Sequence, residues 1–310
     1  MWDTTLLVEH ELPVDADPDQ VWALTRTLAA LSAMPGRFVL DVPAPVAGTD
    51  RLCCLLTDGE PVTSAVHDVR EEAAGQMICW QARSTEPAGK QTLTLRVLRR
   101  PRGCTLRLSI GDVVPRPHAI SREAYWQTQV RAWGDSLRDI AEGRAPWPSP
   151  KMAAGMLEKC SAPRPLRNPV MVSAAAVIHA PTAAVWETVC APESLRLMNP
   201  GNVAYAGHVP GTPERKAGYM QYVVYRHPDG RFTASLSVIM ELAEGVSAVS
   251  QGVAPPHIKL HHLITPVADG TRLELECRWS GPAPRSVTAD AARQLAEAVE
   301  GYKALIEKPA

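Results

Sequence analysis

The chain has 310 residues, of which 45% are hydrophobic, enough for one large domain or two of ordinary size. Its 32 basic and 33 acidic side chains give a formal charge of −1, and neither half has the basic excess that binding to a phosphate backbone requires. No apolar run reaches the roughly 18–20 residues that cross a bilayer, and the acidic, alternating start is unlike a signal peptide. We therefore expect a cytoplasmic protein with neither nucleic acid nor a membrane as partner.

The first half begins with a strand pattern over 6–14, where apolar and polar residues alternate. Asp17 and Pro18 then predict the start of a short helix. Further alternating runs, separated by glycine-containing turns, predict antiparallel strands, and an amphipathic helix over about 119–142 closes the half. The alternating runs are 51–56, 62–71, 76–83, 91–98 and 104–112.

A proline-rich connector follows, after which the same order of elements is expected again. Residues 146–168 form this connector, with a short helix inside it, so residues 1–145 and 169–310 are the two predicted domains. In the second domain the expected elements are a strand over 170–179, a helix over 182–190, several strands up to about 279 and a helix over 286–307.

Short landmarks recur in both halves in the same order and at a nearly constant offset. LPVDADPDQVWAL (12–24) matches AVIHAPTAAVWET (176–188), with an alanine separated by four residues from a Val-Trp pair in each. RPRGCTLRLSI (100–110) matches VADGTRLELEC (267–277), and the closing helices align as well. The chain is therefore an internal duplication. Trp22 and Trp186 of the shared motif are expected to pack a helix onto the sheet.

The order of elements in each half matches a plan of one strand, two short helices, six antiparallel strands and a long helix. This is an α+β helix-grip domain, in which a curved sheet surrounds the C-terminal helix. Because helix and sheet do not close completely on each other, a cavity between them is the expected ligand site. The sequence contains no zinc-ligand spacing, phosphate-binding glycine loop or GxSxG motif, so we expect neither a metal nor a cofactor.

The Ala-x-x-x-x-Val-Trp motif after a first strand, with the closing helix, resembles the START-like (Bet v 1/polyketide cyclase) superfamily. As a tandem, the chain resembles didomain polyketide aromatase/cyclases and START-like proteins of enediyne biosynthetic clusters. The resemblance implies a hydrophobic or aromatic polycyclic ligand, bound for sequestration or self-resistance. The alternative that it implies is an enzyme that cyclises and dehydrates a carrier-tethered poly-β-ketone. Binding is preferred because no catalytic constellation is recognisable in the sequence.

Histidines on apolar strand faces are the first candidate site residues, since histidine is the usual acid or base near neutral pH. Most histidines in such positions are hydrogen-bonded core residues, and this second interpretation stays open. The candidates for catalysis are His10, His67 and, on the closing helix, Tyr302, while His262 is a candidate for ligand binding.

Aromatic side chains form the second group, and either core packing or a stacking surface for an aromatic ligand explains them. In one alternative, Trp126 and Trp133 fill the first cavity and leave the second, tyrosine-lined half as the binding site. The predicted ligand contacts are Trp80, Trp126, Trp133, Tyr219, Tyr222, Tyr225, His262 and Tyr302.

Overall fold

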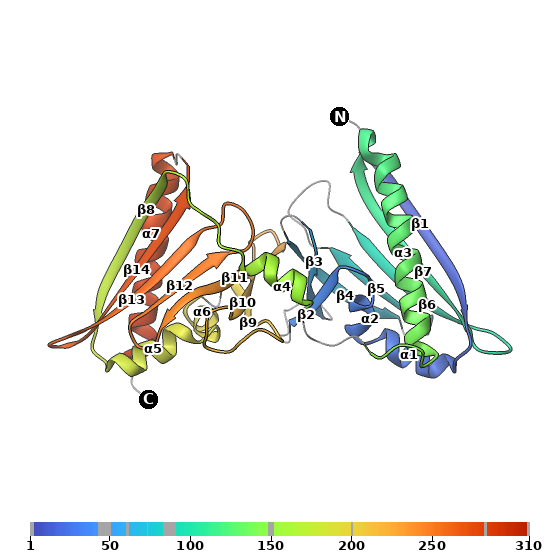
Figure 1. Ribbon diagram of the computed structural model, residues 1–310, viewed down its shortest axis with the longest axis horizontal. Helices are drawn as coiled ribbons and strands as arrows, with labels where there is room; N and C mark the ends of the chain where they lie inside the picture. The colour runs from blue at the N-terminus through green and yellow to red at the C-terminus, as the bar shows by residue number, and fades with distance from the viewer. Residues whose placement is uncertain are drawn as a thin grey trace. The chain divides into compact units, whose positions relative to one another are not determined.

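The computed structural model describes residues 3–42, 51–59, 62–72, 74–82, 91–147, 152–199, 201–281 and 284–308. These residues form two seven-stranded sheets, one from each half of the chain (Figure 1). The chain divides into two compact units, one around each sheet, and each is described by itself.

In the first unit the strands are ordered β1-β7-β6-β5-β4-β3-β2, so β2 to β7 form a meander and β1 pairs with the last strand. The long helix α3 lies on one face of this sheet (Figure 1). The elements are β1 (Asp3–Val14), α1 (Pro18–Thr25), α2 (Ala29–Ser32), β2 (Arg37–Val42), β3 (Leu52–Thr57), β4 (Thr63–Glu72), β5 (Met77–Ala82), β6 (Thr92–Arg99), β7 (Cys104–Pro115), a 3-10 turn (Arg116–His118) and α3 (Ala119–Ala141).

The second unit has the same order of strands, β8-β14-β13-β12-β11-β10-β9, and α7 lies on its sheet as α3 does in the first unit (Figure 1). A short helix, α4 (Ala154–Ser161), precedes β8 in the chain. The other elements are β8 (Pro169–Ile178), α5 (Thr182–Cys190), α6 (Glu193–Met198), β9 (Val203–His208), β10 (Met220–Arg226), β11 (Phe232–Ala243), β12 (Ser247–Gly252), β13 (Lys259–Val267), β14 (Gly270–Ser280) and α7 (Arg285–Ile306).

The sequence pattern explains how each sheet holds its helix. Along β7 every second residue is buried, so one face of the strand forms the core and the other lies outside. At helical spacing, α3 buries Val130 and Leu137 against that face. Asp17 accepts a hydrogen bond from the backbone N–H of Asp19 (3.3 Å) at the start of α1, as predicted. The predicted helix-grip architecture is confirmed in both halves.

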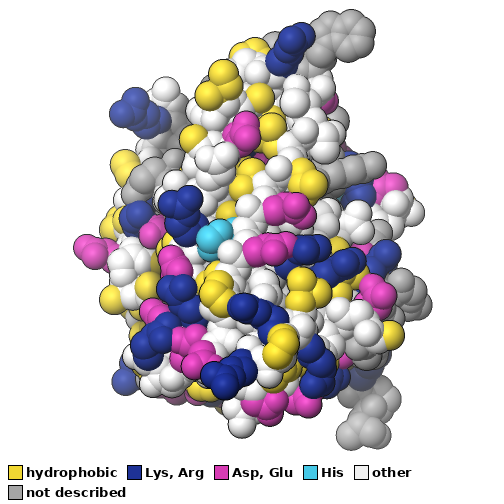
Figure 2. Space-filling model, turned by 90° about the vertical axis from the view of Figure 1, so that its right-hand side faces the viewer, with side chains coloured by type: hydrophobic (Ala, Val, Ile, Leu, Met, Phe, Trp, Pro, Cys, Tyr) yellow, Lys and Arg dark blue, Asp and Glu magenta, His cyan; other side chains and the backbone are white. Residues whose placement is uncertain are grey.

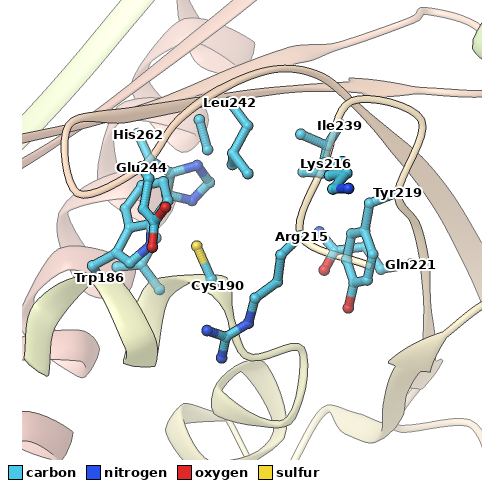
Figure 3. Close-up of a pocket in the computed structure, with 12 residues that line it drawn as sticks. Trp186, Cys190, Arg215, Lys216, Tyr219, Gln221, Ile239, Leu242, Glu244 and His262 are labelled. Carbon is cyan, nitrogen blue, oxygen red and sulfur yellow. The ribbon is translucent and has the colours of Figure 1, made fainter. Parts of the chain in front are cut away.

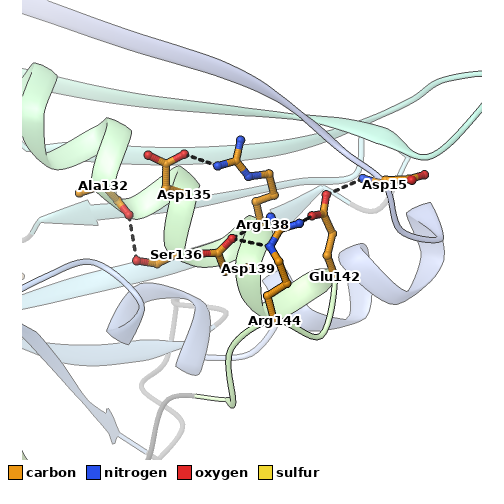
Figure 4. Close-up of polar contacts among 8 residues, drawn as sticks. All are labelled: Asp15, Ala132, Asp135, Ser136, Arg138, Asp139, Glu142 and Arg144. Atoms are coloured by element: carbon orange, nitrogen blue, oxygen red, sulfur yellow. Dashed lines mark hydrogen bonds and ion pairs between the residues drawn. The ribbon is translucent and has the colours of Figure 1, made fainter.

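Matching hydrogen bonds at the ends of the two long helices confirm the duplication. Glu142, just after α3, accepts a hydrogen bond from the backbone N–H of Asp15 at 2.8 Å (Figure 4). Glu307, just after α7, accepts one from the backbone N–H of His179 at 2.7 Å. In the first unit Arg144 also forms an ion pair with Glu142. Each half thus ties the end of its closing helix to the end of its first strand.

A pair of glycines marks the second shared landmark. Gly103 and Gly270 have φ angles of +66° and +139°, which residues other than glycine rarely adopt. A Cβ atom at either position would lie 2.2 Å from a backbone oxygen, that of Val14 or that of Ile178. The turn before the last strand therefore requires glycine in both halves.

The surface of the first unit on its α3 side carries both signs of charge. Figure 2 shows Lys and Arg side chains interspersed with Asp and Glu over this face, with hydrophobic side chains scattered between them. Within the described parts of the chain, we find no helix with the length and apolar character needed to span a membrane.

Candidate functional site

A pocket with a cavity volume of about 100 Å³ lies in the second unit (Figure 3). Helix α5 supplies one wall, the loop before β10 supplies the charged rim, and strands β10 to β13 supply the rest. Trp186 of the repeat motif is 5% exposed and contacts the core as expected, but it also lines the pocket. The lining residues are Trp186, Val189, Cys190, Arg215, Lys216, Tyr219, Gln221, Ile239, Leu242, Glu244, Ala248 and His262.

The register of the two sheets shows where the second unit loses bulk. Residues that pair with one another across successive strands form a row, and one row was followed on the inner face of each sheet. The two rows start from equivalent positions of the first strands. At the fourth position, a tryptophan of the first sheet is replaced by a serine in the second. The rows are Val8–Ile110–Leu93–Trp80 and Val172–Cys277–Leu260–Ser250.

The closing helices differ in the same direction. Trp133 lies nine residues before Glu142, and Ala298 lies nine residues before the equivalent Glu307. Trp126 and Ala291 lie sixteen residues before the same two glutamates. All three tryptophans of the first core therefore have small counterparts in the half that contains the pocket. Large-to-small differences of this kind leave space wherever the backbone does not close in.

In the first unit these tryptophans fill the space between helix and sheet. Trp80 and Trp133 are fully buried and meet edge to face, with ring centroids 5.9 Å apart. The indole N–H of Trp133 donates to the backbone oxygen of Ala30 at 2.7 Å, and that of Trp126 donates to Asp112 at 2.8 Å. The structure thus places three of the predicted ligand contacts in the core.

His262 occupies a place in the second sheet that a leucine fills in the first. The next pair of rows is His10–Leu108–Leu95–Ile78 and Ala174–Leu275–His262–Ala248. The Nδ1 atom of His262 is buried and has no hydrogen-bond partner among the described residues. Burial is the main cause that lowers the pKa of His262 to about 4; the backbone of Ala248 acts in the opposite direction, and neighbouring His261 lowers the pKa again. At neutral pH the pocket therefore contains an uncharged imidazole.

Tyr219 and Cys190 are the other protonatable groups within the pocket. The ring of Tyr219 stacks on His208 at 4.8 Å, and the His208 ring is fixed in turn by a hydrogen bond between Nε2 and the hydroxyl of Thr212 (2.8 Å). Burial raises the pKa of Tyr219 to about 12 and that of Cys190 to about 11. The phenol and the thiol therefore stay protonated at neutral pH.

The rim carries charged groups that differ in how they are neutralised. Arg215 forms a two-pronged ion pair with Glu187, with N–O distances of 2.9 and 2.5 Å. Lys216 and Glu244 also line the pocket, and neither forms an ion pair within the described part of the chain. Among the described residues, no three His, Cys, Asp or Glu side chains gather in a way that could hold a metal ion.

Of the three predicted tyrosine contacts near β10, the structure brings only Tyr219 to the pocket. Tyr222 lies on the other face of β10 from Gln221 and packs against Tyr205, with ring centroids 5.3 Å apart. Tyr225 packs against a small cluster that includes Val203. The pocket therefore shares one residue with that group of tyrosines.

The predicted catalytic candidates are not among the residues that line the pocket. His67 is fully buried in the first unit, where burial lowers its pKa to about 4 and its Nδ1 lies 3.3 Å from the backbone oxygen of Ala65. His10 is half-buried beside Gly134 of α3. Tyr302 is 3% exposed in the core around α7, and burial raises its pKa. His10 and His67 belong to the first unit, whereas Tyr302 packs in the same core cluster as the pocket residues Trp186 and Ala248.

Comparison with solved structures finds similar proteins at low sequence identity. The di-domain ARO/CYC BexL from the BE-7585A biosynthetic pathway is 14% identical, with a TM-score of 0.35, and the match covers 98% of this chain and 100% of that one. The Zhui aromatase/cyclase from Streptomyces sp. R1128 is 18% identical, with a TM-score of 0.40, over 46% of this chain and 96% of that one. A START superfamily protein from Mycobacterium smegmatis is 15% identical, with a TM-score of 0.38, over 44% and 97%. No family model and no curated protein matches the sequence.

The strand order, the long closing helix and the repeated landmarks decide the fold. Each half is a helix-grip domain. In the second helix-grip domain, the sequence predictions included Tyr219 and His262 and missed the other lining residues. The strand registers contain part of the signal, because they set Ile78 of the first sheet against Ala248, which lines the pocket.

Lowering the pH from 7 to 4.5 is expected to destabilise both helix-grip domains. His67 and His262 have folded-state pKa values of about 4, below the roughly 6.5 of an unfolded histidine. Between pH 6.5 and pH 4 the unfolded chain binds more protons at these histidines than the folded chain does. The free energy of unfolding is therefore unaffected by each histidine above pH 6.5 and falls as the pH is lowered through that range. The loss is about 2–3 kcal/mol for each residue at pH 4.5. Urea unfolding across this range measures it.

A matched pair of variants separates the buried histidines from the rest of the chain. The equivalent position of the first domain holds Leu95, so His262→Leu introduces the residue found there. This variant is expected to lose about half of the pH dependence of the unfolding free energy, because one of the two buried histidines is gone. His118→Leu changes an exposed side chain and is expected to leave it unchanged. An unaltered pH dependence in His262→Leu would contradict the prediction.

Proposed function

We propose that the second helix-grip domain binds an apolar, ring-containing small molecule in its pocket without chemical turnover. The observation that carries this proposal is the pocket itself. It lies in the half whose core has small residues at the positions of the first domain's tryptophans, although those small residues are not among the ones that line it. Trp186, Ile239 and Leu242 give that pocket apolar walls, which favour a flat hydrocarbon framework.

The size of the cavity limits how much of a ligand it can bury. An apolar cavity of about 150 Å³ takes up benzene, and this one has about 100 Å³. We infer that one ring enters the cavity and that the rest of a polycyclic ligand lies in its mouth. Pockets that enclose a drug-sized ligand typically have about 300–1,000 Å³, so a long chain folded inside, as a cyclase requires, would not be enclosed by this cavity.

The pKa values also favour binding over catalysis. An acid or base that works near neutral pH has a pKa close to the working pH. The pKa values of His262, Tyr219 and Cys190 are about 4, 12 and 11, so none of these groups is near that value. Aromatase/cyclase activity, carrier tethering, sequestration and self-resistance all stay predictions.

Calorimetric titration with naphthalene derivatives, followed by analysis of the recovered ligand, tests the proposal. We expect one binding site per chain and a ligand that is recovered unchanged. A linear poly-β-ketone thioester should be incubated in parallel and its products analysed by mass spectrometry. If the thioester lost water over many turnovers per protein, the function would be cyclisation and not binding alone. Absence of binding for every aromatic probe would refute the proposal.

A further inference from the structure

The pocket is polar at two separate ends. Figure 3 shows His262 on one side of the pocket and Lys216 on the other, with Leu242 and Ile239 along the wall between them. A ligand that lies along this wall would meet an uncharged ring nitrogen at one end and an ammonium group at the other. The positions of His262 and Lys216 therefore predict which polar groups a bound ligand carries at each of its two ends.

The His262 end suits a hydroxyl group. Its buried Nδ1 has no partner among the described residues, and a buried polar atom without a partner is costly. Neutral imidazole presents a donor or an acceptor at this atom, and a hydroxyl can serve either because it both donates and accepts. An anion is disfavoured here, because the imidazole is uncharged and Glu244 lines the same side of the pocket (Figure 3).

The Lys216 end suits an acidic group. Arg215 also reaches the pocket, but Glu187 neutralises its charge through the two-pronged ion pair. Lys216 is exposed and has no such partner within the described residues. The positive charge that remains available to a ligand at the rim is therefore that of Lys216.

We propose that the ligand is an aromatic hydroxy acid, bound with its hydroxyl at His262 and its carboxylate at Lys216. This inference rests on the proposed binding function and deepens it by naming the class of ligand and its orientation. The rings between the two polar groups contact Leu242 and Ile239, so the ligand keeps the flat apolar framework that the walls favour.

The test uses three probes that share one ring system: 2-naphthol, 2-naphthoate and 6-hydroxy-2-naphthoate. Calorimetry at pH 7.5 is expected to give the highest affinity for 6-hydroxy-2-naphthoate, by about three- to tenfold over each of the others. Lys216→Met should remove the gain from the carboxylate and leave the affinity for 2-naphthol unchanged. Lys303→Met, on α7, is the matched control and should alter none of the affinities.

Variants at His262 test the other end. His262→Leu should remove the gain from the hydroxyl and leave the affinity for 2-naphthoate unchanged, whereas His262→Asn should retain part of that gain because an amide still donates and accepts. Equal affinities of the wild-type protein for all three probes would overturn the ligand class but not the binding function. A uniform loss across all probes in Lys216→Met would overturn the orientation. Absence of binding for all three would overturn the binding function itself.

Discussion

Replacing Trp133 by alanine is expected to lower the free energy of unfolding of the first domain by about 3–5 kcal/mol. The side chain is fully buried, meets Trp80 edge to face and donates a hydrogen bond to Ala30. Its removal leaves a cavity between α3 and the sheet and an unpaired backbone oxygen. Guanidinium unfolding, followed by circular dichroism, measures the change.

Trp147 provides the matched control for this substitution. Its side chain is 53% exposed, so Trp147→Ala is expected to change the free energy of unfolding by less than about 0.5 kcal/mol. If Trp133→Ala cost no more than the control, the tryptophan would not be filling the core, and the structural contrast between the two halves would lose its energetic basis.

Replacing Ala248 by isoleucine is expected to weaken the binding of naphthol probes by about tenfold or more, equivalent to about 1.4 kcal/mol. Ala248 lines the pocket, and at the same position of the first sheet stands Ile78, which is buried. The added carbons would occupy space that we assign to the ligand, and titration calorimetry of the variant measures the effect.

Ala243→Ile is the control, because Ala243 lies in the same hairpin with an exposed side chain. We expect its affinity to equal that of the wild type, and we expect both variants to unfold at similar denaturant concentrations. An Ala248→Ile protein that still bound the probes with full affinity would place the ligand outside this pocket.

The periodicity of the sequence was sufficient to predict the fold. The alternating runs and the closing amphipathic helices predicted most strands and both long helices to within a few residues, since burial on one face is what selects these patterns. The repeated Gly103 and Gly270 could be found from sequence alone because a backbone contact requires them.

The site could be predicted only in part, because it depends on which residues face each other across strands far apart in the chain. Ser250 pairs with Leu260, and this pairing identifies Ser250 as the counterpart of Trp80. The spacing of residues within one strand does not contain that information. Tyr222 shows the opposite case, since the parity of β10 already separates it from Gln221. The rim residue Lys216 belongs to a loop, where no periodic pattern applies.

The contrast between three tryptophans and their small counterparts bears on how such a chain evolves after gene duplication. Both copies keep the same strands, the same glycine turn and the same glutamate at the end of the helix, while the bulk inside differs. Point mutations that exchange large and small side chains can therefore change how fully the core of one copy is packed while the other copy keeps its own packing. Two copies of one fold can diverge in their interiors without inserting, deleting or re-pairing a strand.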